Sequence, residues 1–408
     1  MSSLQILTAI VSVLTLVGVA IGRYPALKMN RATISLVGAT LLIALGALSL
    51  EEAYKAVDWN TILLLFGMMV LNVNLRLAGF FQRVTAHVVT FARTPRRLLA
   101  LIIGVSGLFS AVFLNDTIVL VFTPLVLDVT IALRRNPLPY LVGLVTSANI
   151  GSVATITGNP QNMLVGISSG ITFVDFTLAL APVAVVGLAV AWGVLIMIYR
   201  REFRAVPLAT DVGITFAADA RLLRKSLLAT AVMVVALILG MPVPLAAAVA
   251  AALLLVTRRT EPERVFQEID WGLLVFFCGL FVVTGAIEVS GLGGMLFATL
   301  RPYADGGALP LTAVALLLSN LVSNVPAVML FRPIVPSLAD PPTVWLTLAM
   351  ATTLAGNLTL LGSVANLIVA EIARKRGIHL SFLEYLKAGT AIAVLTLAFG
   401  VYWMSRPM

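Results

Sequence analysis

The stretch ANIGSVATITGNPQNMLVG, residues 148–166, places glycines, a proline and four Asn or Gln side chains in a region that is otherwise aliphatic. Glycine, proline and short polar residues interrupt helices. Irregular backbone cannot face lipid, because each unsatisfied amide costs several kcal/mol there. A loop of this kind inside a membrane must therefore be buried in protein or line a wet cavity.

The composition places the chain in a membrane. Of its 408 residues 60% are hydrophobic and 11% are charged, which is outside the range of soluble domains. The single cysteine, Cys278, excludes a disulfide framework, and two histidines make a zinc enzyme a poor fit. The net charge of +9 agrees with basic loops on one side of a membrane, so it does not require a nucleic acid partner.

Apolar runs long enough to cross about 30 Å of hydrocarbon predict the membrane segments. Uninterrupted spans are expected at residues 4–22, 33–50, 60–79, 172–199, 222–240, 243–257, 272–288 and 387–404. The first of these lacks a basic leader, so we interpret it as a membrane helix and not a signal peptide. Four further apolar stretches are broken in the middle, by LNDT (114–117), SNVP (323–326), the loop quoted above and AGNLTLLGS (355–363).

The chain repeats itself. VDWNTILLLFG (57–67) returns as IDWGLLVFFCG (269–279), NDTIVLVFTP (115–124) as NVPAVMLFRP (324–333), and GNPQNMLV (158–165) as GSVANLIV (362–369). The offset falls from 212 to 204 residues, which we ascribe to a shorter loop between Asn357 and Gly362 than between Asn149 and Gly158. We expect a first repeat at 1–205, with a hairpin at 98–133 and a broken helix at 138–168. The second repeat is expected at 206–408, with a hairpin at 308–338 and a broken helix at 343–373.

Charge indicates how the repeats are oriented. If the LNDT and SNVP segments are re-entrant hairpins, each repeat crosses five times, and the odd number inverts the second copy. Nearly all of the 27 Lys and Arg then fall on one side; Lys55, Arg301 and Arg406 fall opposite, and Arg332 lies in the second hairpin. The predicted fold is an all-α polytopic membrane protein of two inverted repeats, with about ten transmembrane helices, two re-entrant hairpins and two broken helices. Both termini are expected outside an inner (plasma) membrane.

Inverted repeats with paired broken helices are the signature of a secondary transporter that binds its solute near the bilayer midplane. Asn159 is expected to cap a half-helix that begins at Pro160. Ser363, Asn115 and Asn324 are expected to cap its three counterparts. Four helix N-termini, each carrying about half a positive charge, then face one cavity, which suits an anion or an oxygen-rich acid.

The candidate binding residues are the polar side chains and glycines at the four breaks. They are Asn115, Asp116, Thr117, Asn149, Thr155, Thr157, Gly158, Asn159, Asn162, Ser323, Asn324, Asn357, Thr359, Gly362, Ser363 and Asn366. Asp116 is the expected proton or cation carrier, with a plain helix cap as the alternative. The recurring asparagines bind ligand or cap helices, and the hydroxyls bind an oxyacid or their own helix carbonyls. Arg332 lines the pathway, pairs with an acid, or extends to the interface.

FSAVFLNDTIVLVFTPLVLDV (109–129) and TSANIGSVATITGNPQNMLVG (146–166) resemble the first half of the ion transporter superfamily of arsenite permeases, sodium/proton antiporters and sodium-coupled carboxylate carriers. LVSNVPAVML (321–330) and AGNLTLLGSVAN (355–366) are similar to its second half. The motifs most resemble silicon and arsenite efflux transporters and their bacterial relatives. The carboxylate carriers' Ser-Asn-Thr is replaced here by Leu-Asn-Asp-Thr and Ser-Asn-Val-Pro, which disfavours a two-sodium dicarboxylate mechanism. The resemblance also implies a possible homodimer.

No nucleophile, metal or nucleotide motif is present, so we expect neither an enzyme nor an ATP-driven pump. No channel filter is found either. The expected function is proton-coupled efflux of a small inorganic oxyacid, silicic acid or arsenite, by alternating access. The alternatives are sodium-coupled uptake of a carboxylate or oxyanion, and sodium/proton antiport. The expected partners are the solute, the coupling ion (H⁺ or Na⁺) and the bilayer, with no organic cofactor, metal or nucleic acid.

Overall fold

The computed structural model describes residues 2–24, 28–204, 208, 219–256 and 261–406. Twenty α-helices lie in these ranges. The first ten are α1 (Ser3–Ile21), α2 (Arg31–Ala44), α3 (Leu50–Ala56), α4 (Trp59–Leu77), α5 (Phe80–Phe91), α6 (Pro95–Val112), α7 (Asn115–Ala132), α8 (Pro137–Ser152), α9 (Pro160–Ser169) and α10 (Phe173–Ile198). Strands β1 (Arg23–Tyr24) and β2 (Met29–Asn30) form one short antiparallel pair, and a 3-10 turn, η2 (Ile156–Gly158), precedes α9.

The second ten helices follow the same order. They are α11 (Ala220–Ile238), α12 (Val243–Leu255), α13 (Pro262–Gln267), α14 (Trp271–Val289), α15 (Leu292–Ala304), α16 (Ala308–Val322), α17 (Asn324–Phe331), α18 (Pro341–Ala355), α19 (Val364–Lys375) and α20 (Phe382–Met404), with a 3-10 turn, η3 (Val335–Ser337), after α17. Each helix thus has a partner ten places later in the chain. The predicted boundary at residues 205 and 206 lies outside the described residues.

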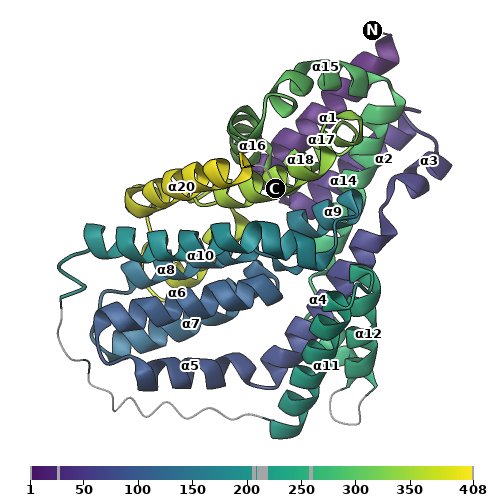
Figure 1. The fold of residues 1–408 in the computed structure, drawn as a ribbon. Helices are drawn as coiled ribbons and strands as arrows, with labels where there is room; N and C mark the ends of the chain where they lie inside the picture. The colour runs from purple at the N-terminus through teal and green to yellow at the C-terminus, as the bar shows by residue number, and fades with distance from the viewer. Residues whose placement is uncertain (1, 25–27, 205–207, 209–218, 257–260, 407–408) are drawn as a thin grey trace.

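The helix contacts are exchanged between the two halves. Helix α4 packs on α12 while α14 packs on α2, and α6 packs on α8 while α16 packs on α18. In the same way α7 meets α19, α17 meets α9, and the last helices of the two halves, α10 and α20, pack on each other. Figure 1 shows α5, α6, α7, α8 and α10 stacked on one side, with α11 and α12 beside α4 on the other. This exchange is what an approximate two-fold relation between the halves produces.

The all-helical membrane architecture agrees with the sequence prediction. Seven of the described helices are long and apolar enough to cross a bilayer, and α2, α12 and α16 are shorter apolar helices. The predicted interruptions occur where expected, with α6 ending at Val112 before α7 and α16 ending at Val322 before α17. The sequence did not predict the four short helices α3, α5, α13 and α15. They escaped a search for continuous apolar runs because they are short and carry polar residues between apolar ones.

The repeated motif ends in a glycine that lets two helices approach closely. A Cβ on Gly67 of α4 would lie 2.8 Å from the Ala247 carbonyl carbon of α12, and one on Gly279 of α14 would lie 2.7 Å from the Ser35 carbonyl carbon of α2. Small residues at such crossings are the usual means by which membrane helices pack, since lipid supplies no hydrophobic drive between them. The two glycines therefore serve the same crossing in each half.

We predict that Gly67→Ala and Gly279→Ala each destabilise the protein, by about 1–3 kcal/mol, because the added methyl meets backbone that no rotamer change can move. The measurement is thermal unfolding of the purified protein in detergent. Gly104→Ala on α6 is the control, since nothing lies within 4 Å of its Cβ position. It is expected to be neutral or up to about 1 kcal/mol stabilising. Equal melting of all three variants would contradict this assignment.

Candidate functional site

The first broken helix is interrupted inside the protein. Helix α8 ends at Ser152, and α9 begins at Pro160 after an extended Asn159. The Asn159 Oδ1 atom accepts a hydrogen bond of 2.8 Å from the Asn162 backbone N–H, which confirms the predicted cap. Gly158 is required here, because a Cβ would lie 2.4 Å from the backbone carbonyl oxygen of Ser152 and 2.8 Å from that of Ser110.

One asparagine holds each break together. The Asn162 Nδ2 atom donates to the carbonyl oxygens of Ser152 (2.9 Å) and Thr155 (3.0 Å). In the second half, Asn366 Nδ2 donates to the carbonyl oxygens of Gly356 (2.7 Å) and Thr359 (2.9 Å). Both asparagines are fully buried. Their side chains replace the backbone hydrogen bonds that the break removes, so their shared role is structural.

Asn149 joins the two halves. Its Nδ2 atom donates to Asn357 Oδ1 (2.9 Å) and Asn366 Oδ1 (3.1 Å). Its Oδ1 atom accepts from Asn115 Nδ2 (3.1 Å) at the first hairpin tip and from the Ser363 hydroxyl (3.4 Å). A single amide, 2% exposed, therefore links the first hairpin and both broken helices.

Thr353 is a site residue that the sequence did not predict. Its Oγ1 atom accepts from Asn159 Nδ2 (3.2 Å) and Gln161 Nε2 (3.1 Å), and lies 3.3 Å from Asn162 Oδ1. In the same way Asn149, from the first half, contacts Ser363 and Asn366 of the second break. The geometry therefore pairs Asn149 with Thr353, and the predicted pairing of Asn149 with Asn357 is wrong.

The shortening of the second half lies earlier than predicted. Pro137 and Pro341, which open α8 and α18, are already 204 residues apart, as are Asn149 and Thr353. The hairpin tips Asn115 and Asn324 are still 209 apart. The offset therefore falls from 212 to 209 before the tips, where α16 has 15 residues and α6 has 18, and from 209 to 204 in the second arm of the hairpin, where α17 has 8 residues and α7 has 18. An offset of 204 residues, applied to Asn149, leads to Thr353, so this constant offset was the sequence signal that would have found it.

Three of the predicted caps are wrong. Helices α7 and α17 begin at Asn115 and Asn324, so these side chains lie inside the first turn and neither helix has a side-chain cap. Ser363 precedes α19 with extended backbone, but its hydroxyl bonds Asn149 and does not cap the helix. Ser323 itself adopts a φ of +79°, a conformation that side chains other than glycine rarely adopt.

The hairpin tips leave amide oxygens without partners. The Oδ1 atoms of Asn115 and Asn324 are buried, and neither makes a hydrogen bond within the described residues. Buried polar atoms are nearly always satisfied, so each such atom in a native structure calls for a ligand or water. Among the described residues Asn324 makes no side-chain bond to the Asn149 network, so each tip offers an unpaired acceptor of its own.

Hydroxyls tie each broken helix to a hairpin. Thr157 Oγ1 donates to the Ala111 oxygen of α6 (3.3 Å), and Thr155 bonds the same atom. In the second half, Thr359 Oγ1 donates to Asn320 Oδ1 of α16 (3.4 Å), and a Cβ on Gly362 would lie 3.0 Å from that same oxygen. These threonines are occupied by protein contacts. Asn320 is a further residue that the sequence did not single out.

Asp116 and Thr117 follow Asn115 at the first tip. The Thr117 hydroxyl accepts from Asn72 Nδ2 of α4 at 3.4 Å. Asp116 is half-buried and makes no hydrogen bond or ion pair within the described part of the chain. Arg31 and Asp270 are the charged side chains whose fields reach it. Its side chain does not cap α7, because the bond expected of a cap is absent among the described residues.

Arg332 pairs with an acid. Its Nη2 atom lies 3.1 Å from Asp58 Oδ2, and its guanidinium carbon lies 5.4 Å from the Phe281 ring centre. Asp58 is 8% exposed and also caps α4 through the N–H groups of Asn60 and Thr61. The ion pair therefore joins the end of α17 to the start of α4. Of the roles considered for Arg332, the pairing with an acid is the one observed.

Two broken helices joined to each other and to the first hairpin tip by buried amides, with a second hairpin in the other half, define a class of membrane transport protein. The comparisons with known proteins agree. The family model described as "Citrate transporter" (CitMHS) matches residues 13–355. This chain belongs to that family of the ion transporter superfamily, and it is a multi-pass membrane transporter.

The relatives include the silicon efflux transporter LSI3 of Oryza sativa subsp. japonica, 31% identical over 92% of this chain and 93% of that protein. An uncharacterized transporter of Mycobacterium tuberculosis is 30% identical over 92% of this chain and 94% of its own. The putative transporter arsB of Dictyostelium discoideum is 23% identical over 92% and 87%. Among solved structures, the YdaH transporter of Alcanivorax borkumensis matches with a TM-score of 0.59 at 12% identity, over 99% of this chain and 97% of that one. That likeness establishes the fold alone.

We predict that Asn162→Asp and Asn366→Asp destabilise the protein by at least about 3 kcal/mol, because a carboxylate oxygen would face two carbonyl oxygens in a dry site. Thermal unfolding in detergent measures the effect. Asn136→Asp is the matched control, since Asn136 is an exposed cap of α8 and aspartate caps equally well. If Asn162→Asp or Asn366→Asp melted at the wild-type temperature, the structural role of that residue would be excluded.

Proposed function

We propose that this protein exports a small, uncharged inorganic hydroxyacid, silicic or arsenous acid, in exchange for protons. The observation that carries the proposal is the pair of buried, unpaired amide oxygens, Asn115 Oδ1 and Asn324 Oδ1. An uncharged hydroxyacid has O–H donors for these acceptors. It also has oxygens that can accept from the backbone N–H groups of α7 and α17, which no side chain caps.

The charges near the site favour an uncharged solute. Arg332 is engaged by Asp58, so its charge is already compensated. The remaining polar groups of the breaks are amides and hydroxyls, and Asp116 would repel an anion. Citrate or a divalent oxyanion is recognised best by charge-assisted, bidentate arginine contacts. The names of the silicon efflux and arsB relatives support the same solute class.

Asp116 is the proposed proton carrier. It follows Asn115 directly, and its carboxyl has no hydrogen-bond or ion-pair partner within the described residues. A carboxyl group near the solute site can bind a proton and release it again. It couples the proton flux to the solute flux when proton binding and solute binding both affect the same alternating-access step. We place the protein in the inner (plasma) membrane with both termini outside, and a homodimer is compatible with this proposal.

Sodium-coupled uptake of a carboxylate or oxyanion is the second candidate. Amide oxygens such as Asn115 Oδ1 are also ligands for a small cation, as are the carbonyls of unwound backbone. The description of the matching family as a citrate transporter favours this alternative. Sodium/proton antiport through Asp116 is the third candidate.

The solute test uses proteoliposomes containing the purified protein, with labelled arsenite, silicic acid, phosphate, sulfate and succinate. We expect saturable flux of arsenite or silicic acid that increases with an imposed pH gradient and does not depend on sodium. Succinate or phosphate flux that requires sodium would replace the proposal with the second candidate. Conductance at channel-like rates would exclude a carrier altogether.

Asp116→Asn should remove the pH-gradient dependence while the protein still folds, because an amide can neither bind nor release a proton near neutral pH. The comparison is gradient-driven flux against solute counterflow, which needs no coupling ion. Asp128→Asn is the control on the same helix, because Asp128 is exposed and pairs with Arg376 at 2.9 Å. Unchanged gradient-driven flux in Asp116→Asn would refute the carrier role and leave the solute assignment standing.

A further inference from the structure

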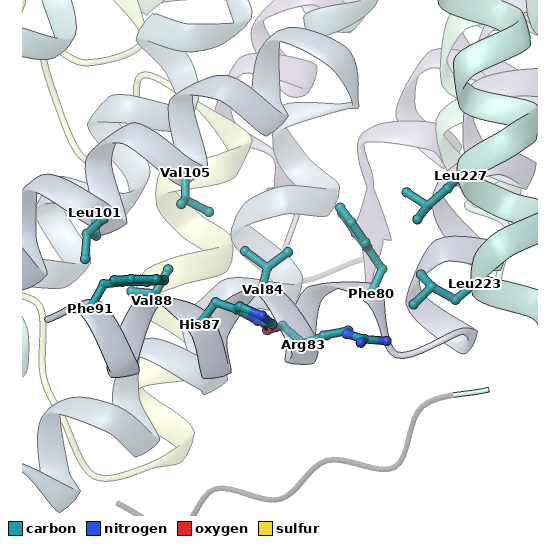
Figure 2. A pocket seen from close by; sticks show the side chains of 10 residues that line it. All are labelled: Phe80, Arg83, Val84, His87, Val88, Phe91, Leu101, Val105, Leu223 and Leu227. Atoms are coloured by element: carbon teal, nitrogen blue, oxygen red, sulfur yellow. Dashed lines mark hydrogen bonds between the residues drawn. The ribbon is translucent and has the colours of Figure 1, made fainter. Parts of the chain in front are cut away.

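An apolar groove lies outside the polar centre, between α5, α6 and α11. Its volume is about 420 Å³, within the range of about 300–1,000 Å³ that holds small ligands. Eight of its lining residues are apolar, and the two polar ones, Arg83 and His87, belong to α5. Figure 2 shows Arg83 and His87 beside each other at the rim, below Val84, with Phe80 and Leu223 near the Arg83 end.

The groove lies where membrane helices begin and end. Helix α5 follows the end of α4 through Gly79, which has a φ of +77°, and leads through Thr94 into the start of α6. The first turn of α11 packs here too, with Leu222 and Leu223 against Ala78. Helix α5 runs back along α6: Phe80 packs on Phe109 at 5.1 Å near the hairpin tip, and Phe91 lines the groove together with Leu101 near the start of α6. The groove therefore has apolar walls on three helices and a basic rim on α5.

The rim carries arginines that form no ion pair within the described residues. Arg83 and His87 are exposed and one helix turn apart, and His87 Nδ1 lies 2.7 Å from the Arg83 carbonyl oxygen. Arg221 and Arg224 are exposed at the start of α11, beside the lining residue Leu223. No carboxylate forms an ion pair with these three arginines in the described ranges, whereas Arg76 nearby pairs with Glu268.

We propose that this groove binds one anionic phospholipid, such as a phosphatidylglycerol. Its phosphate contacts Arg83 and His87, and an acyl chain lies along Phe80, Val105 and Leu227. Arginine matches phosphate in charge and geometry, and basic pockets between membrane helices are typical sites for acidic headgroups. The inference does not depend on the solute or the coupling ion.

The basic rim and the apolar walls of the groove together favour an anionic lipid over simpler ligands. Free phosphate would use the basic rim and leave the apolar walls empty. A zwitterionic lipid brings its own ammonium, which offsets the attraction of its phosphate to Arg83. Only an anionic amphiphile satisfies both parts. Because α5 connects α4 to the first hairpin arm α6, such a lipid occupies the joint between them.

The test is native mass spectrometry of the full-length protein with dioleoyl phosphatidylglycerol and dioleoyl phosphatidylcholine in equal amounts. Wild type should retain phosphatidylglycerol preferentially. Arg83→Gln should weaken that binding about fivefold, the effect expected of one basic residue at an anionic surface, and Arg83→Gln/His87→Gln more. Val105→Trp fills the groove and leaves the charges, so it should also reduce retention. Arg264→Gln, an exposed arginine on α13, is the control and should behave as wild type.

Two results would overturn the proposal. One is equal retention of the two lipids by wild type, or of phosphatidylglycerol by wild type and the rim variant. The other is full competition by millimolar inorganic phosphate together with normal retention in Val105→Trp, which would reduce the site to a phosphate contact. Thermal unfolding of each variant in lipid-free detergent checks folding, since Arg83 and His87 are exposed and their substitution should leave it unchanged.

Discussion

The requirement that every backbone amide inside a membrane be satisfied without water governs the centre of this protein. Two helices, α8–α9 and α18–α19, are interrupted there, and each interruption removes internal hydrogen bonds. The chain restores them with side-chain amides, Asn162 in one half and Asn366 in the other, each donating to two carbonyls of its own break. The breaks are thus stable, built features of the fold.

The same requirement joins the two halves. Asn149 connects the second break to the first hairpin, and Thr353 makes the reciprocal connection to the first break. Each break is therefore completed by a residue from the opposite half, so neither half can form the centre alone. The glycines at 67 and 279 act at the periphery in the same reciprocal way, because each admits a helix of the other half. The polar contacts at the centre and the glycine contacts at the periphery thus both join residues of one half to residues of the other.

The order of the helices and the positions of the four breaks were predictable, because hydropathy and the repeated motifs report them directly. The Asn159 cap was predictable because Asn-Pro at a helix start has one strong local solution. The caps assigned to Asn115, Asn324 and Ser363 were not, since a local pattern does not reveal that a side chain one residue inside a helix has a tertiary partner or none. Thr353 was missed for a related reason. A hydroxyl in an apolar helix looks like a residue that bonds its own backbone, and only the three-dimensional exchange identifies it as the counterpart of Asn149.

The halves differ where charge is concerned, and the difference bears on function. Position 116 is aspartate in the first hairpin and its counterpart, Val325, is apolar; position 332 is arginine in the second hairpin and its counterpart, Thr123, is neutral. Arg332 is held by Asp58 at the start of α4, whereas Asp116 forms no ion pair in the described residues and lies within the fields of Arg31 and of Asp270, which act on it in opposite directions. One hairpin is thus tied to the opposite half by an ion pair, and the other carries a carboxyl that has no ion-pair partner among the described residues. Under the coupling proposed above, protonation changes at a single hairpin, through Asp116, while the Arg332–Asp58 ion pair of the other hairpin stays in place.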